Sequence, residues 1–522
     1  MKGIATRPDP FLDNPHLDAC VSAGLDRHFT STSCPRVRPA QREQRFLQSH
    51  VPEDGMPAQA YIQQLFEEVV PHSVRTHDPR FIGHMTSALP AFTGPLGRLI
   101  TALNQNVVKM ETADALVYQE RQAIAILHRL VYAFEQSFYD THIQNPGSTL
   151  GTMVSGGTLG NISALWCARN RSLGPKGHFL GVSQEGLSEA LRAHGYRRAV
   201  IIGSSLMHYS LEKAADLLGI GRKSLLRIQA TESGRVDLAR LEQAVRRSVA
   251  EGDLILALVG IAGTTETGSV DPLGSMADLA ASYGCHFHVD AAWGGPVLFS
   301  RRFRHLLDGI ERADSVTIDG HKQLYVPMGA GLTLFRDPAL AQSIETAANY
   351  IIRADSADPG RRTIEGSRPA MAAYLHGALH ILGRSGYQEL MDAGIEKAAY
   401  LAHSIQTRPA FELLSEPQLN IVVYRYIPPP LREAVQTRRL STGQNQMIDD
   451  CNRRLQELQW NRGNSFVSRT TLTNTRYGAD SPLVTLRAVL ANPLTTRRDL
   501  TAILDEQTEI GDTISNFAGR AL

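Results

Sequence analysis

The chain has 522 residues, of which 43% are hydrophobic and 20% are charged, and its formal net charge is +1. These values fit a soluble globular protein with more than one domain, because one hydrophobic core rarely organises so long a chain. A net charge so close to zero argues against nucleic acid or an anionic membrane as the partner, and we expect small molecules instead.

The cysteines and the N-terminus indicate a cellular compartment. The cysteines are odd in number and have no metal-ligand spacing: Cys20, Cys34, Cys167, Cys285 and Cys451. This pattern favours a reducing environment and no metal site. Met1–Pro10 leads into no apolar signal-peptide core, and no stretch is long and apolar enough to cross a bilayer. We therefore expect a cytoplasmic protein that has no membrane anchor.

The N-terminal region predicts little regular structure at first. Residues 1–52 are rich in Pro, Arg, Ser and Asp, which predicts an extended or partly ordered arm. A helical pattern begins after Pro57, with one apolar face formed by Tyr61, Leu65, Val69 and Val70. The stretch His77–Ala91 contains two prolines and a glycine and predicts a loop, which is either a linker or part of a site.

The middle of the chain alternates between helices and short apolar strands. Leu103–Ser137 has a helical pattern, broken near Glu111–Asp114. Seven strands follow: Gly151–Val154, Ala199–Ile202, Leu225–Ile228, Leu254–Val259, His286–Val289, Ser315–Ile318 and Gly331–Phe335. This alternation predicts a mostly parallel seven-stranded sheet with helices on both faces and ligands at the carboxyl ends of its strands.

The C-terminal region predicts a smaller α/β part. Its expected helices are Met371–Leu382, Gln388–Ile405, and two near Met447–Leu458 and Thr496–Ile510. Its expected strands are Asn420–Tyr426 and Leu483–Val489, with Pro428–Gln444 as a surface connector. We therefore predict an N-terminal arm and helical segment with a site loop (1–100), a large domain (101–370) and a small domain (371–522).

An acid and a lysine follow two neighbouring strands. Asp290 follows one of them, and Lys322 follows the next. Pyridoxal phosphate needs such a pair, because a lysine amine forms a Schiff base with its aldehyde and a carboxylate pairs with its pyridinium nitrogen. Taken alone, a lysine is more often a surface group and an aspartate a turn or cap residue. Together, and with Gly294 and Gly295 leaving room for a ligand, they favour the cofactor.

A glycine turn adds a candidate phosphate site. Ser155, Gly156, Gly157 and Thr158 follow a strand and open a helix, where exposed backbone N–H groups bind anions. The alternative is an ordinary strand-to-helix turn, and the lysine of a nucleotide P-loop is missing.

The motifs around Asp290 and Lys322 also have a family resemblance. HVDAAWGG and ADSVTIDGHK strongly resemble the fold-type I pyridoxal-phosphate amino acid decarboxylases, the glutamate, aromatic and aspartate decarboxylase group. The resemblance runs from roughly His77 to Leu500. It implies the fold-type I pyridoxal-phosphate transferase fold, amino acid decarboxylation with pyridoxal 5'-phosphate, and a homodimer.

The same resemblance implies roles for individual residues. Lys322, Asp290 and His208 are implied to be catalytic, with His208 stacked on one face of the cofactor ring and Ala292 under the other. Thr265 is expected near the ring and His321 at the phosphate. The remaining cofactor-binding candidates are Ser155, Gly156, Gly157, Thr158 and Ser315.

Substrate-binding candidates come from both ends of the chain. Arg487, in LRAVLANP, falls on the arginine that holds a substrate carboxylate in similar glutamate decarboxylases, and a guanidinium suits a carboxylate pair. The alternative is a strand arginine paired on the solvent face. His84 and Thr86 lie in the loop that lines the active site in these decarboxylases. The proton donor stays open between Tyr350 and His208.

Three further sequence runs narrow the choice of substrate. FIGHMTSALP, TIDGHKQLYVPMGAG and TIEGSRPA look most like the pyridoxal-dependent aspartate 1-decarboxylases. The resemblance therefore implies conversion of L-aspartate to β-alanine and CO2, which supplies a pantothenate precursor. L-glutamate or cysteine sulfinate on the same scaffold is the alternative, and a non-catalytic protein with this fold is less favoured.

Overall fold

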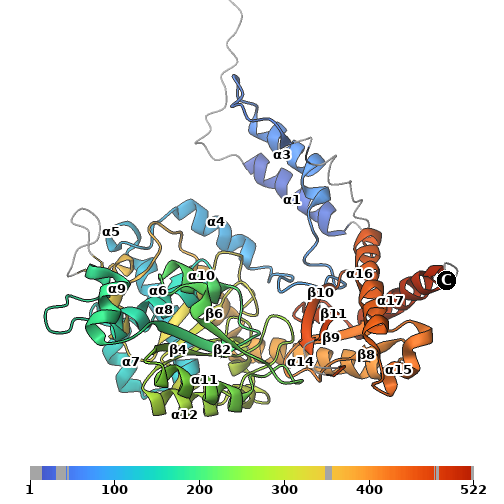
Figure 1. Ribbon diagram of the computed structural model, residues 1–522. Coiled ribbons are helices and arrows are strands. Elements are labelled where there is room, and N and C mark those ends of the chain that lie inside the picture. Colours follow the sequence, from blue (N-terminus) through green and yellow to red (C-terminus); the bar gives the residue numbers. More distant parts are fainter. Residues whose placement is uncertain are drawn as a thin grey trace, which may run out of the picture.

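The computed structural model describes residues 15–30, 43, 46–346, 356–474, 476–477 and 481–518. Figure 1 shows two β-sheets in separate halves of the body and a pair of N-terminal helices that stands away from both. Within the described residues no helix has the length and apolar character needed to cross a membrane.

The larger sheet has seven strands and is mostly parallel, which confirms the predicted fold. The strand order is β1-β7-β6-β5-β4-β2-β3. Only β7 runs against its neighbours, because it pairs antiparallel with both β1 and β6. The strands are β1 (Gly151–Val154), β2 (Ala199–Ser204), β3 (Leu225–Ile228), β4 (Leu254–Ile261), β5 (His286–Asp290), β6 (Ser315–Asp319) and β7 (Gly331–Phe335).

Helices cover both faces of this sheet, because successive side chains of a buried strand point to opposite faces. On β2, Ile201 packs with one group of helices, α8 (Gly157–Ser172), α9 (Val182–His194) and α10 (Ser210–Leu217). Val200 and Ile202 pack with the other group, α6 (Ala115–Tyr132), α11 (Leu238–Ala250) and α12 (Leu273–Tyr283). Most residues of these strands are therefore buried, as their short apolar runs predicted.

The smaller sheet is antiparallel, with strand order β10-β11-β9-β8. Its strands are β8 (Phe411–Leu413), β9 (Ile421–Tyr426), β10 (Ser468–Asn474) and β11 (Ser481–Val489). Three helices pack with it: α14 (Gly383–Gln406), α16 (Thr442–Arg462) and α17 (Arg497–Ala518). A capping box between Ser441 and Gln444 starts α16 earlier than predicted, inside the expected connector, which also contains α15 (Arg432–Gln436).

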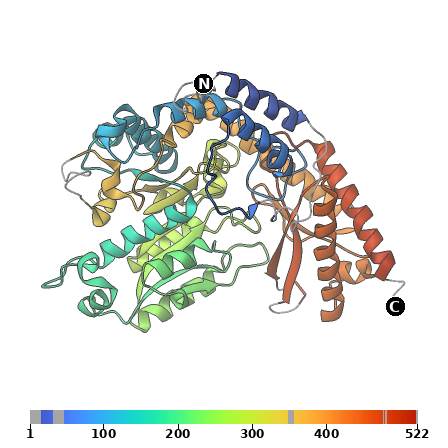
Figure 2. The same cartoon turned by 90° about the horizontal axis from the view of Figure 1, so that it is seen from above.

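The N-terminal region is more helical than predicted. The expectation of an extended arm is wrong for α1 (Pro15–Thr30), which pairs with α3 (Ala58–Glu68), as Figure 2 shows from above. Proline at the first position of α1 suits a helix start, since its missing N–H would have had no partner there. The described residues also form four other α-helices: α4 (Thr93–Leu103), α5 (Met110–Ala113), α7 (Gln136–His142) and α13 (Ala372–Ile381).

The loop His77–Ala91 connects the two halves of the body. Ile82 donates its N–H to the Phe466 carbonyl, and its own carbonyl accepts from Val489 N–H at the end of β11. These bonds place Gly83 and His84 beside the small sheet. The domain boundaries at residues 100 and 370 remain a prediction.

Candidate active site

A cavity of about 320 Å³ lies at the carboxyl ends of the large sheet's strands. Its volume falls in the range of small-molecule sites, roughly 300–1,000 Å³. The structure brings ten predicted cofactor-binding residues into its wall: Ser155, Gly156, Gly157, Thr158, His208, Thr265, Asp290, Ala292, His321 and Lys322. They come from turns after five different strands, which is why their sequence separations are large.

Lys322 points to an acid that the sequence analysis did not single out. Its Nζ lies 2.9 Å from Oδ2 of Asp319, the last residue of β6. Asp319 is 3% exposed, and its Oδ1 has no hydrogen-bond partner among the described residues. The motif ADSVTIDGHK contained this acid, but its contact with the lysine three positions later depends on the turn that follows β6.

The start of α8 can hold a phosphate. Gly156 caps the helix without a side chain, so the first backbone N–H groups of α8 face the cavity rather than a cap. A Cβ on Gly157 would lie 2.9 Å from Asp319 Oδ2, and one on Gly156 would lie 3.3 Å from His321 Cε1. Side chains at these two positions would therefore fill the space beside the helix N-terminus.

Two more groups border this helix start. His321 donates from Nδ1 to the Ala330 carbonyl at 2.9 Å, so the remaining Nε2 faces Asp319 at 3.8 Å. Ser155 donates its backbone N–H to Glu365 Oε2 at 3.1 Å. The glycines and the open helix start together fit the phosphate end of pyridoxal phosphate.

Asp290 and His208 lie on the inner side of the cavity. The Asp290 carboxylate is 7% exposed and accepts from Ala292 N–H at Oδ1 and from the Asn161 amide at Oδ2. Burial is the main cause that lowers the pKa of His208, with Asp290 opposing and Lys322 reinforcing the effect. The His208 imidazole is therefore neutral at pH 7, as an apolar ring stack needs.

Ser315 is the one predicted cofactor residue that the structure keeps out of the cavity. It is the first residue of β6, whereas the cavity lies beyond the last residue, Asp319. Its hydroxyl is buried between His286 Nε2 at 2.7 Å and His288 Nδ1 at 2.8 Å. Ser315 therefore does not line the cavity, and its predicted role in cofactor binding remains a prediction.

The substrate-binding candidates lie beside the cavity and do not line it. Arg487 is 7% exposed, and its Nε donates to the carbonyl of Thr265, a wall residue, at 2.6 Å. Burial lowers the pKa of Arg487 to about 10, and the nearby acid Glu266 opposes this. Among the described carboxylates, none forms an ion pair with Arg487.

His84 and Thr86 form a small polar turn near Arg487. Thr86 N–H donates to His84 Nδ1 at 3.3 Å, and the Thr86 hydroxyl lies 3.0 Å from the same nitrogen. The pKa of His84 is lowered by burial first and then by the charges of Arg487, Lys322 and His321. The residue before His84, Gly83, accepts from Arg487 Nη1 at its carbonyl, so the turn lies beside Arg487. Tyr350 lies outside the described residues.

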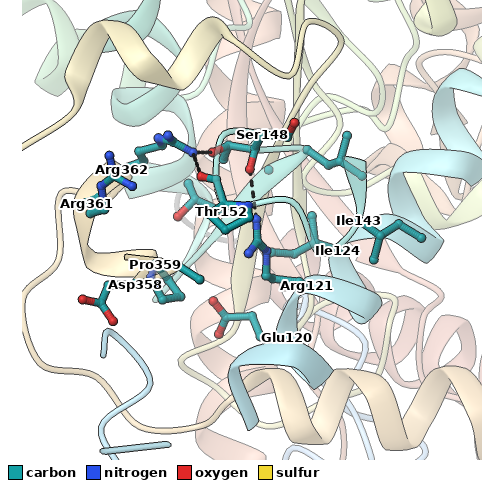
Figure 3. Close-up of a pocket in the computed structure, with 15 residues that line it drawn as sticks. Glu120, Arg121, Ile124, Ile143, Ser148, Thr152, Asp358, Pro359, Arg361 and Arg362 are labelled. Atoms are coloured by element: carbon teal, nitrogen blue, oxygen red, sulfur yellow. Dashed lines mark hydrogen bonds between the residues drawn. The ribbon is translucent and has the colours of Figure 1, made fainter. Parts of the chain in front are cut away.

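A second, smaller cavity of about 50 Å³ lies between α6 and residues 357–362 (Figure 3). It contains none of the predicted site residues. Its arginines are engaged with the chain itself, since Arg121 donates to the Ser148 carbonyl at 3.1 Å and Arg362 donates to Thr149 Oγ1 at 2.9 Å. The chemistry therefore belongs to the larger cavity.

Comparisons with known proteins agree with this geometry. The family described as "Pyridoxal-dependent decarboxylase conserved domain" matches residues 39–427. An aspartate 1-decarboxylase of Aliivibrio fischeri is 46% identical over 90% of this chain and 86% of its own. A cysteine sulfinic acid decarboxylase of Mus musculus is 30% identical over 85% of this chain and 84% of its own.

Solved structures show the same fold. The crystal structure of mouse CSAD in apo form has a TM-score of 0.81 at 27% identity, covering 95% of this chain and 98% of that one. The structure of Oryza sativa TDC with PLP and tryptamine has a TM-score of 0.82 at 20% identity, covering 97% and 99%.

Fold, cavity and matches together define a fold-type I enzyme that uses pyridoxal phosphate. The chain belongs to the pyridoxal-dependent decarboxylase family and is a pyridoxal-phosphate amino acid decarboxylase.

Proposed function

We propose that this decarboxylase converts L-aspartate to β-alanine and CO2. The observation that carries the proposal is Arg487, a buried guanidinium beside the cavity with no ion-pair partner among the described carboxylates. Its Nε and Nη1 donate to neutral oxygens of Thr265, Gly83 and Ser468. A substrate carboxylate would add the opposite charge that these neutral partners do not supply. The relative at 46% identity, named an aspartate 1-decarboxylase, supports the choice among acidic substrates.

The wall residues then take the following roles. Lys322 would attach the cofactor through its amine, the turn at Gly156 and Gly157 would hold the phosphate, and Asp290 would face the ring nitrogen. His208 and Ala292 would flank the ring. When bound, pyridoxal phosphate supplies an acceptor for the electron pair released as the α-carboxylate leaves.

The substrate's two carboxylates need different partners. Arg487 would hold one of them through a guanidinium fork. His84 and Thr86, which follow Gly83 beside Arg487, are proposed for the other. Because the Thr86 N–H points at His84 Nδ1, a neutral His84 carries its proton on Nε2, where it can donate to an oxygen.

The assembly is proposed to be a homodimer. Large apolar side chains of the N-terminal half stay open in the single chain, with exposures of 53% for Tyr61, 55% for Leu99 and 44% for Tyr118. No side chain of α3 is buried. A second copy that covers α3, α4 and α6 would bury these groups. A cytoplasmic location and the supply of a pantothenate precursor are likewise proposed.

The substrate proposal predicts a ranking of specificity constants. L-aspartate is expected to have the highest kcat/KM in a panel with L-glutamate, cysteine sulfinate and an aromatic amino acid. One methylene in a pocket is worth only about 1–3 kcal/mol, so measurable activity on L-glutamate is also expected. CO2 release measured side by side tests the ranking. A preference for the aromatic amino acid would overturn the assignment of an acidic substrate.

Arg487→Lys is expected to lose most activity towards aspartate, by about 100-fold in kcat/KM, because a lysine cannot form the paired contact of a guanidinium. Arg425→Lys is the matched control, since Arg425 is also buried in the small sheet but pairs with Glu412 away from the cavity. Steady-state kinetics on both variants check the prediction. Equal losses in both would show that Arg487 acts through the fold.

A further inference from the structure

A chain of hydrogen bonds runs from the cavity wall, where Asn161 and Asp290 both lie, into the buried interior. Asn161 on α8 is 1% exposed, and its Nδ2 donates to Asp290 Oδ2 and to Ser210 Oγ, each at 2.9 Å. Its Oδ1 lies 3.0 Å from Nε2 of His288, which is fully buried on β5. One amide therefore joins the acid, a serine and a histidine.

The amide's orientation fixes where the protons are. A carboxylate oxygen only accepts, so Asn161 must turn its NH2 group to Asp290 and its carbonyl to His288, which then donates from Nε2. Burial lowers the pKa of His288 to about 4, so the ring is neutral and its Nδ1 accepts. The Ser315 hydroxyl donates to this Nδ1 at 2.8 Å and accepts from His286 Nε2 at 2.7 Å.

The orientation of the Asn161 amide also fixes the proton positions at Ser210 and His208. The Ser210 hydroxyl accepts from Asn161, so its own proton goes to His208 Nδ1 at 2.9 Å. An independent contact agrees, because the Ser210 backbone N–H also points at that nitrogen, at 3.3 Å. A nitrogen that accepts twice carries no proton, and a neutral His208 therefore keeps its proton on Nε2.

We propose that Asn161 is a positioning residue that holds the Asp290 carboxylate in place and sets the tautomer of His208. One side chain would thus fix both the acid that faces the ring nitrogen and the histidine that stacks on the ring. The inference rests on the roles proposed for Asp290 and His208. The other titratable groups that face this cluster come from three elements: His286 and His288 on β5, Asp319 and Lys322 at the end of β6, and Lys213 on α10.

Two substitutions separate this role from a purely structural one. Asn161→Ala removes the donor and is expected to weaken pyridoxal phosphate binding at least about tenfold, the scale of a hydrogen bond to a charged group. Asn161→Asp keeps the shape and sets a second carboxylate beside Asp290. At high pH the two carboxylates repel, and at lower pH a shared proton restores a donor to Asp290. Affinity relative to the parent should therefore recover as pH falls in Asn161→Asp only.

The measurement is an absorbance titration of each apoprotein with pyridoxal phosphate over a series of pH values. Asn452→Ala is the control, because Asn452 is a fully buried amide bonded to the Tyr426 and Ile448 carbonyls in the small domain. It should bind the cofactor like the parent. If Asn161→Ala does not fold, the pH response of Asn161→Asp decides alone.

Two results would overturn the proposal: parental affinity in Asn161→Ala at every pH, or an Asn161→Asp affinity that does not recover as pH falls. Asp290→Asn in the same titration distinguishes an error in the role of Asp290 from an error in the role of Asn161. Parental binding in that variant would show that the role of Asp290 itself is wrong, whereas weak binding there with parental binding in Asn161→Ala would reject Asn161 alone.

Discussion

Lys322→Ala is expected to lower the rate of CO2 release by at least about four orders of magnitude, which is the scale on which a covalent catalytic group matters. The reason is that Lys322 is the lysine in the cavity wall, next to the glycine turn and Asp319. Single-turnover and steady-state CO2 assays with saturating pyridoxal phosphate measure the loss.

Lys397→Ala is the matched control for this experiment. Burial lowers the pKa of Lys397 to about 8. A lysine with a lowered pKa is more readily deprotonated near neutral pH, so Lys397 is the described lysine to compare with Lys322 as the attachment point. It lies in α14, and its Nζ donates to the Asn492 carbonyl, outside the cavity. This variant should keep parental activity. A large loss in Lys397→Ala with activity retained in Lys322→Ala would reverse the assignment.

Asp290→Asn is expected to lower kcat by about 100- to 1,000-fold and to weaken cofactor affinity, because the variant no longer presents a negative charge to the ring nitrogen. The shape of the side chain is kept, so the loss reports the charge. Kinetics and an absorbance titration with the cofactor measure the two effects.

Asp271→Asn provides the comparison for Asp290. Asp271 is also a buried acid after a strand, and it accepts from the Val236 and Ile261 N–H groups without lining the cavity. Its substitution should lower the free energy of unfolding and leave kcat of the folded protein near the parental value. An Asp290→Asn enzyme with parental kcat would contradict the account.

Much of the fold could be predicted because the large sheet is buried on both faces. Its strands are short, mostly apolar runs, and their alternation with helices predicted the order of the elements along the chain. β10 (Ser468–Asn474) was missed because SRTTLTN has a single apolar residue and no strand pattern. It is a strand because its backbone pairs with β11. α1 was missed because the composition around it is typical of an irregular arm.

The site was predictable where a motif and a strand end coincide, as at Asp290 and Lys322. Ser315 shows that belonging to a motif does not place a residue at the cavity. It belongs to the same short motif as Lys322, yet four residue steps of about 3.3 Å each place it at the opposite end of β6 from the cavity. Asn161 was missed for the opposite reason. Its partners Asp290 and His288 are distant in sequence and meet it only when α8 packs on β5.

The central claim, that Lys322 carries pyridoxal phosphate in a decarboxylase site, is tested most directly by borohydride reduction of the cofactor-loaded protein followed by peptide mass spectrometry. The account predicts one stable pyridoxyl adduct, on the peptide that contains Lys322, and none in Lys322→Ala. An adduct on Lys397 or on any other lysine, or an adduct that persists in Lys322→Ala, would contradict it.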